Sequence, residues 1–202
     1  EFDGRSELSV EQLLAKANVD LRLRALASRS RMRLEADGLH ADWRQALHDD
    51  GQASNLDAFT EHLLAAHLPH AVVIDCSGSA EVAERYEGWL AAGIHVVTPN
   101  KQAGSGPLSR YQRIHAAAAA SGARFRYEAT VGAGLPAITT LRDLVDTGDE
   151  VLAEEGIFTG TLAWLFNRFD GSQPFSELVA QARLTGYTAP VPRDDPSGVE
   201  VV

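Results

Sequence analysis

The sequence predicts an α/β protein, in which a parallel sheet flanked by helices precedes a smaller α+β unit. Two observations support this prediction. Short apolar runs alternate with helical patterns up to Thr130, and such alternation with short connections is typical of a parallel sheet. Beyond Thr130 the chain becomes glycine-rich and then helical. We therefore expect a boundary near Gly134 and two domains, residues 1–134 and 135–202.

The predicted elements alternate along the chain. Ser9, followed three residues later by Gln12, is typical of a helix start. Ser79 and Gly93 are the expected caps of one helix. The run 71–76 is continuously apolar over its first four residues, which predicts a strand buried on both faces. Strands are predicted over 19–27, 71–76, 94–98 and 123–130, helices over 55–68, 79–93, 108–122 and 176–186, a helical part within 131–145, and strand-like stretches within 149–170.

Composition limits the classes of partner. The net charge of −10 argues against nucleic acid and against an anionic membrane, because both attract a positive surface. No apolar run approaches the roughly 18–20 residues that span a bilayer, and no secretory signal pattern opens the chain. Cys76 is the single cysteine. We therefore expect no internal disulfide, a reducing cytoplasmic location, and a small buried thiol rather than a nucleophile.

In an open α/β sheet, ligands bind beyond the carboxyl ends of the strands. Ser28, Arg29 and Arg31 follow the first predicted strand. Arginines at this point suit the 2′-phosphate of NADP, and an exposed, solvated turn is the alternative interpretation. Ser77 and Gly78 follow the 71–76 strand, where small residues let a ligand approach the backbone. From this motif alone, a simple N-capping loop is the stronger interpretation.

Two further segments carry candidate chemistry. Lys101 follows the strand 94–98, where a lysine can bind an anion or transfer a proton, or can simply be solvated. Its position alone leaves both interpretations open. The turn 131–136, Val-Gly-Ala-Gly-Leu-Pro, comes shortly after Glu128. Its glycines permit positive φ and can turn carbonyls toward a cation, with Glu128 as a carboxylate ligand, and a purely structural turn is the alternative.

One pattern is missing from the sequence. No G-x-G-x-x-G follows a first strand, although this is the fingerprint of pyrophosphate binding. We expect that a first strand and its glycine loop belong to a part of the protein outside this chain.

Four segments together resemble homoserine dehydrogenase in their order and spacing. They are GIHVVTPNKQA, YEATVGAGLP, GIFTGTLAWLFNRF and GYTAPVPRDDPSG, and the closer likeness is to the dehydrogenase part of bifunctional aspartokinase–homoserine dehydrogenases. The resemblance implies NADP- or NAD-linked interconversion of L-homoserine and L-aspartate 4-semialdehyde, on the path to threonine and methionine. It implies a Rossmann-like cofactor domain, here without its first strand and glycine loop, and a partial α+β catalytic and dimerisation domain. A homodimer and a fused aspartokinase domain are the implied partners.

The resemblance also implies roles for individual residues. Lys101 would be a catalytic lysine close to the nicotinamide, and Ser77 and its neighbours would contact the cofactor. The remaining roles fall into two sets: a site for a monovalent cation, sodium, made by Glu128 and the carbonyls of Val131, Ala133 and Leu135, and a homoserine pocket lined by Gly160, Thr161, Tyr187, Asp195 and Glu200.

Three positions depart from the family pattern. Ala189 stands where a substrate-binding glutamate is expected, Val191 replaces an aspartate, and Glu200 replaces another aspartate. The lysine that follows in the family would lie beyond Val202, so we expect that the 202-residue chain alone completes no turnover. Two alternatives therefore remain: a degenerate, non-catalytic module that serves dimerisation or regulation of a fused kinase, and a related dehydrogenase with an altered substrate.

Overall fold

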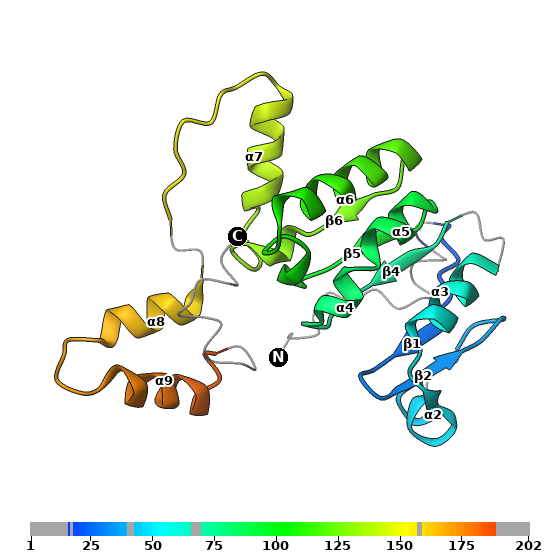
Figure 1. Cartoon of the computed structure of the whole chain (residues 1–202), viewed down its shortest axis with the longest axis horizontal. Coiled ribbons are helices and arrows are strands. Elements are labelled where there is room, and N and C mark those ends of the chain that lie inside the picture. Colours follow the sequence, from blue (N-terminus) through cyan, green and yellow to red (C-terminus); the bar gives the residue numbers. More distant parts are fainter. Residues whose placement is uncertain (1–15, 17, 40–42, 66–69, 157–158, 189–202) are drawn as a thin grey trace. The chain divides into compact units, whose positions relative to one another are not determined.

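The computed structural model describes residues 16, 18–39, 43–65, 70–156 and 159–188 (Figure 1). The helix start expected at Ser9 lies outside these residues. The chain divides into two compact units, Glu1–Pro69 and His70–Val202. The two-domain boundary expected near Gly134 stays a prediction.

The first unit contains a small antiparallel sheet. Only the last three residues of the strand predicted over 19–27 form a strand, and the chain then reverses. The main-chain N–H of Ser28 donates to the Arg31 carbonyl (2.7 Å), and the Ser28 hydroxyl accepts from the Arg31 N–H (3.1 Å). This turn makes a hairpin where a parallel connection was expected. The elements are β1 (Ala25–Ala27), β2 (Arg31–Leu34), α2 (Trp43–Asp50), β3 (Gln52–Ala53) and α3 (Leu56–Ala65), with sheet order β1-β2-β3.

The second unit contains the parallel sheet that the sequence predicts. Its strands are β4 (Val72–Ile74), β5 (His95–Val97) and β6 (Phe125–Arg126), in the order β4-β5-β6. Val96 lies opposite Val73 on one side and Phe125 on the other, so the register aligns apolar residues across all three strands.

Helices and two short 3-10 turns connect and follow these strands. They are α4 (Ala80–Ala83), α5 (Tyr86–Ala91), η1 (Lys101–Ala103), α6 (Leu108–Ser121), η2 (Glu128–Thr130), α7 (Ala137–Asp146), α8 (Gly160–Arg168) and α9 (Phe175–Leu184). The helix predicted over 79–93 is thus two helices. As expected, the Ser79 hydroxyl caps the first of them by accepting from the Val82 N–H (3.4 Å), and Gly93, with φ +84°, follows the second.

The strand-like interpretation of 149–170 is wrong for the residues that the structure describes. Residues 149–156 form no regular element, and 160–168 form α8. The apolar residues of α8 serve a helix–helix contact, in which Leu165 packs against Leu178 and Ala182 of α9. A short apolar run does not by itself distinguish a buried helix from a strand.

The core of the second unit lies on one side of the parallel sheet. Val96, Tyr86, Leu90 and Ile114 are buried there, where α5 packs against β5 and against α6 (Figure 1). Side chains alternate along a strand, so Val72 (48% exposed) and Ile74 (70% exposed) point to the opposite side. The prediction that residues 71–76 are buried on both faces is therefore wrong.

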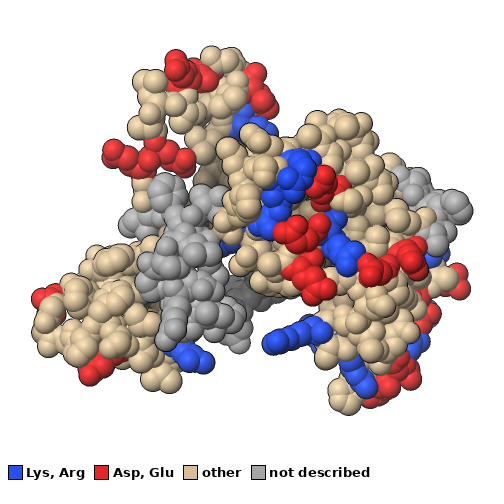
Figure 2. Space-filling model, in the orientation of Figure 1, with Lys and Arg blue, Asp and Glu red and all other residues tan. Residues whose placement is uncertain are grey.

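The surface of the second unit carries ion pairs between helices. Arg110 of α6 pairs with Glu84, and Arg113 pairs with Glu87 of α5 at 2.9 Å. Acidic and basic side chains are intermixed on the face drawn in Figure 2. Within the described part of the chain, no helix combines the length and apolar character needed to cross a membrane.

Candidate functional site

Two predicted candidate segments meet at the carboxyl edge of the parallel sheet. Strands β4 and β5 run side by side in the same direction, so the segments that follow them emerge at one edge. The loop with Ser77 and Gly78 follows β4, and η1, which begins at the half-buried Lys101, follows β5. Helix α4, which follows the Ser77 loop, packs against η1.

A buried polar network lies directly behind this edge. Asp75 is 6% exposed, Thr98 2% and Asn100 3%. The Asp75 Oδ2 atom accepts from the Tyr86 hydroxyl (2.5 Å) and from the Asn100 side-chain amide (2.9 Å). The Thr98 hydroxyl donates to the Asp75 carbonyl (2.9 Å) and accepts from the Asn100 N–H (2.8 Å). Buried polar groups that are satisfied in this way fix one arrangement of the segments that carry them.

The Ser77 loop is open to solvent. Ser77 and Gly78 are exposed, and a Cβ atom on Gly78 would meet no other atom within 4 Å. The Ser77 N–H donates to Asp75 Oδ1 (2.7 Å), which ties the loop to the strand end. The loop therefore has the accessible backbone that a cofactor needs. Cys76, expected to be buried, is exposed, because the alternation of side chains continues past β4 and places Cys76 on the exposed side with Ile74.

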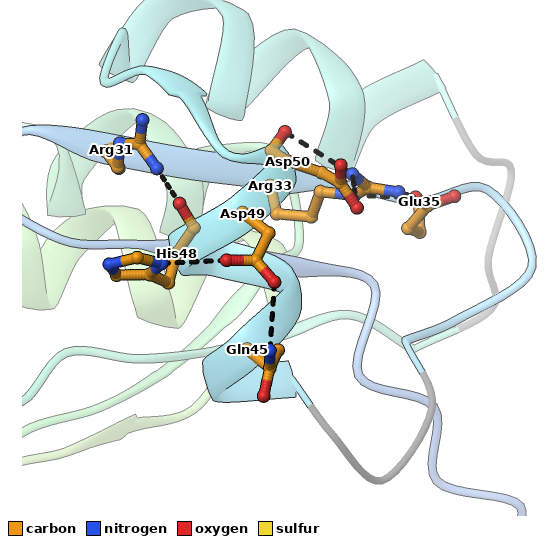
Figure 3. A network of polar contacts seen from close by, with 7 residues as sticks. All are labelled: Arg31, Arg33, Glu35, Gln45, His48, Asp49 and Asp50. Carbon is orange, nitrogen blue, oxygen red and sulfur yellow. Dashed lines mark hydrogen bonds and ion pairs between the residues drawn. The ribbon is translucent and has the colours of Figure 1, made fainter.

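The arginines of the first unit have different surroundings. Arg31 donates to the main-chain carbonyl of His48, in the last turn of α2 (Figure 3). A cation in this place satisfies a helix-terminal carbonyl. Arg33 pairs with Glu35 and with Asp50, whose carboxylate is 3.4 Å away (Figure 3). Arg29 instead lies exposed between Ser28 and Arg31 in the hairpin turn.

Glu128 lies shortly before the glycine-rich turn, and its carboxylate accepts hydrogen bonds in the first turn of α7. Its carboxylate accepts from the Thr139 N–H (2.9 Å) and from the Thr139 hydroxyl (2.6 Å). In the turn that joins Glu128 to α7, Gly132 (φ +70°) and Ala133 (φ +53°) both adopt the left-handed region. This conformation is uncommon for a residue with a side chain and reorients the carbonyls of the turn. Val131 is half-buried, whereas Ala133 and Leu135 are exposed.

The electrostatics of Glu128 favour the ionised carboxylate. Partial burial pushes its pKa upward, but hydrogen bonds from Thr139 and Ile138 and the charge of Arg142 outweigh that effect, so the pKa lies below its ordinary value. A depressed pKa means that the folded state binds the proton less tightly than the unfolded state. The stabilisation by Glu128 is therefore complete above the ordinary pKa and is lost as the pH falls through the lowered pKa.

We expect Thr139→Val to reveal this pH dependence. The substitution removes one donor to Glu128 and should lower the unfolding free energy at pH 7 by roughly 0.5–1 kcal/mol. The difference from the parent should shrink between pH 5 and pH 3, as measured by urea unfolding. Thr140→Val is the matched control, because the Thr140 hydroxyl donates to the Pro136 carbonyl and not to a carboxylate. An equal pH dependence in both variants would contradict this account of Glu128.

The structure brings together three of the residues predicted to line a substrate pocket. Gly160 begins α8 after the N-cap Thr159, and the Thr161 hydroxyl donates to the main-chain carbonyl of Tyr187. The Tyr187 ring stacks on Trp164, with ring centroids 5.6 Å apart. The first turn of α8 and the segment after α9 thus form one surface. Asp195 and Glu200 lie outside the described residues.

A cavity of about 710 Å³ lies in the second unit, between the Asn100 segment and α7. It is bordered by Asn100, by Val131 of the glycine-rich turn, and by an aromatic wall that includes His115 and Tyr127. Burial lowers the pKa of His115, with a smaller contribution from Arg142. The cavity therefore connects the Asn100 turn with the turn after Glu128 and presents a mainly apolar, aromatic interior.

Sequence reasoning missed several of the residues that build this edge. Asp75 lies inside the buried strand predicted over 71–76, and a lone acid in that position was a usable signal. Thr98 and Asn100 stand in the Thr-Pro-Asn-Lys segment, and the Asn100 side chain caps the turn that begins at Lys101. Tyr86 carried no local signal, because only the fold brings its hydroxyl to Asp75.

Two family models and several known proteins match most of this chain. The family model described as "Homoserine dehydrogenase, NAD binding domain" matches residues 7–128, and the model described as "Homoserine dehydrogenase" matches residues 136–202. A bifunctional aspartokinase/homoserine dehydrogenase 1 of Zea mays, named as chloroplastic, is 48% identical over 186 residues, which cover 91% of this chain and 20% of that protein. A homoserine dehydrogenase of Schizosaccharomyces pombe is 41% identical over 166 residues, covering 80% of this chain and 44% of that protein.

Solved structures show the same fold. A Candida auris protein of unknown function superposes with a TM-score of 0.75 at 35% identity, over 95% of this chain and 55% of that one. A hyperthermophilic archaeal homoserine dehydrogenase in complex with NADPH superposes with a TM-score of 0.66 at 20% identity, over 95% of this chain and 61% of that one. The chain thus spans less than two thirds of each of these relatives.

Proposed function

Because this chain belongs to the homoserine dehydrogenase family, we propose that the complete protein interconverts L-homoserine and L-aspartate 4-semialdehyde with NADP or NAD. The observation that carries the proposal is the common sheet edge, where Lys101 and the open Ser77 loop emerge from adjacent parallel strands. This arrangement fits a lysine that works beside a bound nicotinamide cofactor.

The residues at the edge fit such a cofactor. The exposed backbone at Ser77 and Gly78 can approach it without steric hindrance. Arg29 belongs to the other compact unit, where it is exposed in the hairpin turn, and its chemistry suits the 2′-phosphate of NADP. The nicotinamide supplies the hydride chemistry when bound. Lys101 would hold or move the proton at the substrate oxygen that changes between hydroxyl and carbonyl. For Arg31 we propose a structural role before a role in cofactor binding, because its guanidinium donates to the main-chain carbonyl of His48 in the last turn of α2.

The amino-acid part of the substrate would bind at the surface formed by α8 and Tyr187. The N-terminal turn of α8, at Gly160 and Thr161, favours a carboxylate, because the main-chain N–H groups and the dipole of a helix N-terminus favour negative charge. Asp195 and Glu200 would contribute carboxylates to the ammonium group. Glu128, with the carbonyls of Val131, Ala133 and Leu135, provides the oxygen ligands that a hard monovalent cation such as sodium takes. The lowered pKa of Glu128 supports an ionised ligand at neutral pH.

The proposed partners and location follow from the relatives and the surface. The Zea mays relative is named as a bifunctional aspartokinase/homoserine dehydrogenase, so we propose that an aspartokinase domain is fused to this one in the complete protein. A homodimer is consistent with large exposed apolar side chains in the second unit, among them Leu152 and Leu184, each 87% exposed. We propose a cytoplasmic location, because the one cysteine of this chain, Cys76, is a free and exposed thiol, which suits a reducing compartment. The predicted boundary at Gly134 falls between the two matched segments, 7–128 and 136–202.

The test is the initial rate of L-homoserine oxidation by the complete protein, with NADP⁺ and then with NAD⁺. We expect a rate well above background and a preference for NADP⁺. Arg29→Ala should weaken the use of NADP⁺ by roughly 10-fold and leave NAD⁺ unaffected, since one charge-assisted hydrogen bond is lost. A folded, cofactor-binding protein without activity would favour a non-catalytic module or an altered substrate, which Ala189 and Val191 already suggest.

A further inference from the structure

The Ser77 loop and the Asn100–Lys101 segment, which lie at the same edge of the parallel sheet, are both hydrogen-bonded to the buried carboxylate of Asp75. Asp75 Oδ1 accepts from the Ser77 N–H (2.7 Å), on the cofactor-loop side. Asp75 Oδ2 accepts from the Asn100 side-chain amide (2.9 Å), on the lysine side. The Asn100 side-chain oxygen in turn caps η1, the turn that begins at Lys101, by accepting from the Gln102 N–H (3.0 Å). A single side chain thus connects the Ser77 loop to the turn that carries Lys101.

Tyr86 fixes the orientation of this carboxylate. It is fully buried, and its hydroxyl lies 2.5 Å from Asp75 Oδ2 and 2.9 Å from the Thr98 hydroxyl oxygen. Tyrosine has one hydroxyl proton, and a carboxylate oxygen is a stronger acceptor than a hydroxyl oxygen. Burial, with a further contribution from Asp75, raises the pKa of Tyr86, which keeps this donor protonated. The Asp75 carboxylate is therefore hydrogen-bonded to Tyr86 of α5 within the core, and to Ser77 and Asn100 at the edge of the sheet.

We propose that Tyr86 and Asp75 are positioning residues, which set the distance and angle between the cofactor loop at Ser77 and the turn that carries Lys101. Neither side chain needs to touch substrate or cofactor. The role rests on the proposed function, because positioning matters for catalysis only if a hydride and a proton are transferred at this edge. Small displacements of reacting groups cost large factors in rate, so the hydroxyl of one buried tyrosine can control turnover.

Tyr86→Phe is the direct test, because it removes the hydroxyl and keeps the ring in the core. Asp75 Oδ2 then keeps only Asn100 as a side-chain partner, and the carboxylate can rotate. We expect kcat for L-homoserine oxidation to fall about 10-fold, with KM for L-homoserine within roughly 2-fold of the parent, since the surface at Thr161 and Tyr187 is untouched. Asp75→Asn should reduce kcat at least as much, because an amide offers one acceptor atom in place of two.

Trp89→Phe perturbs the packing against the Tyr86 ring, whose centroid lies 6.0 Å from that of Trp89, and leaves the Tyr86 hydroxyl in place. Trp89 is 2% exposed and lies on α5, three residues after Tyr86. Its truncation should lower the melting temperature at least as much as Tyr86→Phe does, with kcat within roughly 2-fold of the parent. If Trp89→Phe and Tyr86→Phe reduce kcat equally, or if kcat of folded Tyr86→Phe equals that of the parent, the positioning role is wrong.

A second readout needs no enzymatic activity. The chain contains two lysines, Lys16 and Lys101, and Lys16 is exposed. Amine acetylation followed by peptide mass spectrometry therefore reports on Lys101 with an internal reference. We expect Tyr86→Phe to change the ratio of the Lys101 and Lys16 labelling rates at least 3-fold, and Trp89→Phe to leave it unchanged. An unchanged ratio in Tyr86→Phe would overturn the proposal, whereas an inactive parent with a changed ratio would contradict only the proposed function.

Discussion

Replacing Lys101 by methionine should lower kcat/KM for L-homoserine oxidation by about 10²–10⁴-fold in the complete protein, the range that general acid–base catalysis contributes. Methionine keeps an unbranched stem of similar length, so the packing of η1 should survive. Only the ammonium group is lost, and with it the proton transfer at the substrate oxygen. Initial rates with NADP⁺, together with the affinity for NADPH measured by fluorescence, check the prediction.

The control for this substitution is the other lysine of the chain. Lys16→Met should leave kcat/KM within roughly 2-fold, because Lys16 is exposed and lies in the other compact unit. Lys101→Met should also bind NADPH nearly as well as the parent if its main role is in the chemical step. Nearly full activity in Lys101→Met would contradict the catalytic role of Lys101. It would favour the alternative interpretation, in which the lysine only contacts solvent.

Ala189→Glu should improve the use of L-homoserine by roughly 10- to 100-fold in kcat/KM. Alanine cannot accept a hydrogen bond from the substrate ammonium, and a charge-assisted hydrogen bond is worth about 1.5–3 kcal/mol. The family resemblance expects a glutamate at this position. The measurement is kcat/KM for L-homoserine with NADP⁺ in the parent and in the variant.

The companion variant Val191→Asp tests whether charge alone explains a gain. The site needs an acceptor at a defined position, so Val191→Asp should give a smaller gain than Ala189→Glu. If the parent is active and Ala189→Glu changes nothing, another residue already holds the ammonium. If both parent and variant are inactive, the non-catalytic interpretation gains support. Activity toward substrates without an ammonium group would instead identify a dehydrogenase with an altered substrate.

The parallel part of the fold was predictable because its signals are local. The β-branched runs at β4 and β5 and the helical periodicity of α3, α6 and α9 are each contained in fewer than twenty consecutive residues. The placement of Lys101 and the Ser77 loop at one sheet edge then follows from the rule that parallel strands point the same way. The sequence also carried the family resemblance, which the matches over 7–128 and 136–202 confirm.

The first unit shows where local signals fail. The alternation in 19–27 predicts a long strand, but the regular strand is limited to Ala25–Ala27, which pairs antiparallel with β2. The deciding contacts are the hydrogen bonds between Ser28 and Arg31, which close a hairpin that periodicity does not encode. In the same way, α8 became a helix because α9 offers Leu165 a buried surface.

The sequence by itself determined which chemical groups this protein has at the ends of its strands: Lys101, the Ser77 loop and the carboxylate of Glu128. Only the tertiary structure decided which residues, distant in sequence, form the hydrogen bonds that hold the surrounding segments in place. Asp75 and Asn100 are 25 residues apart, and Arg31 and His48 are 17 apart, yet each pair is hydrogen-bonded. The physical reason is that propensity and periodicity act over a few neighbouring residues, whereas a buried hydrogen bond depends on which distant segments the packed core brings within 3 Å.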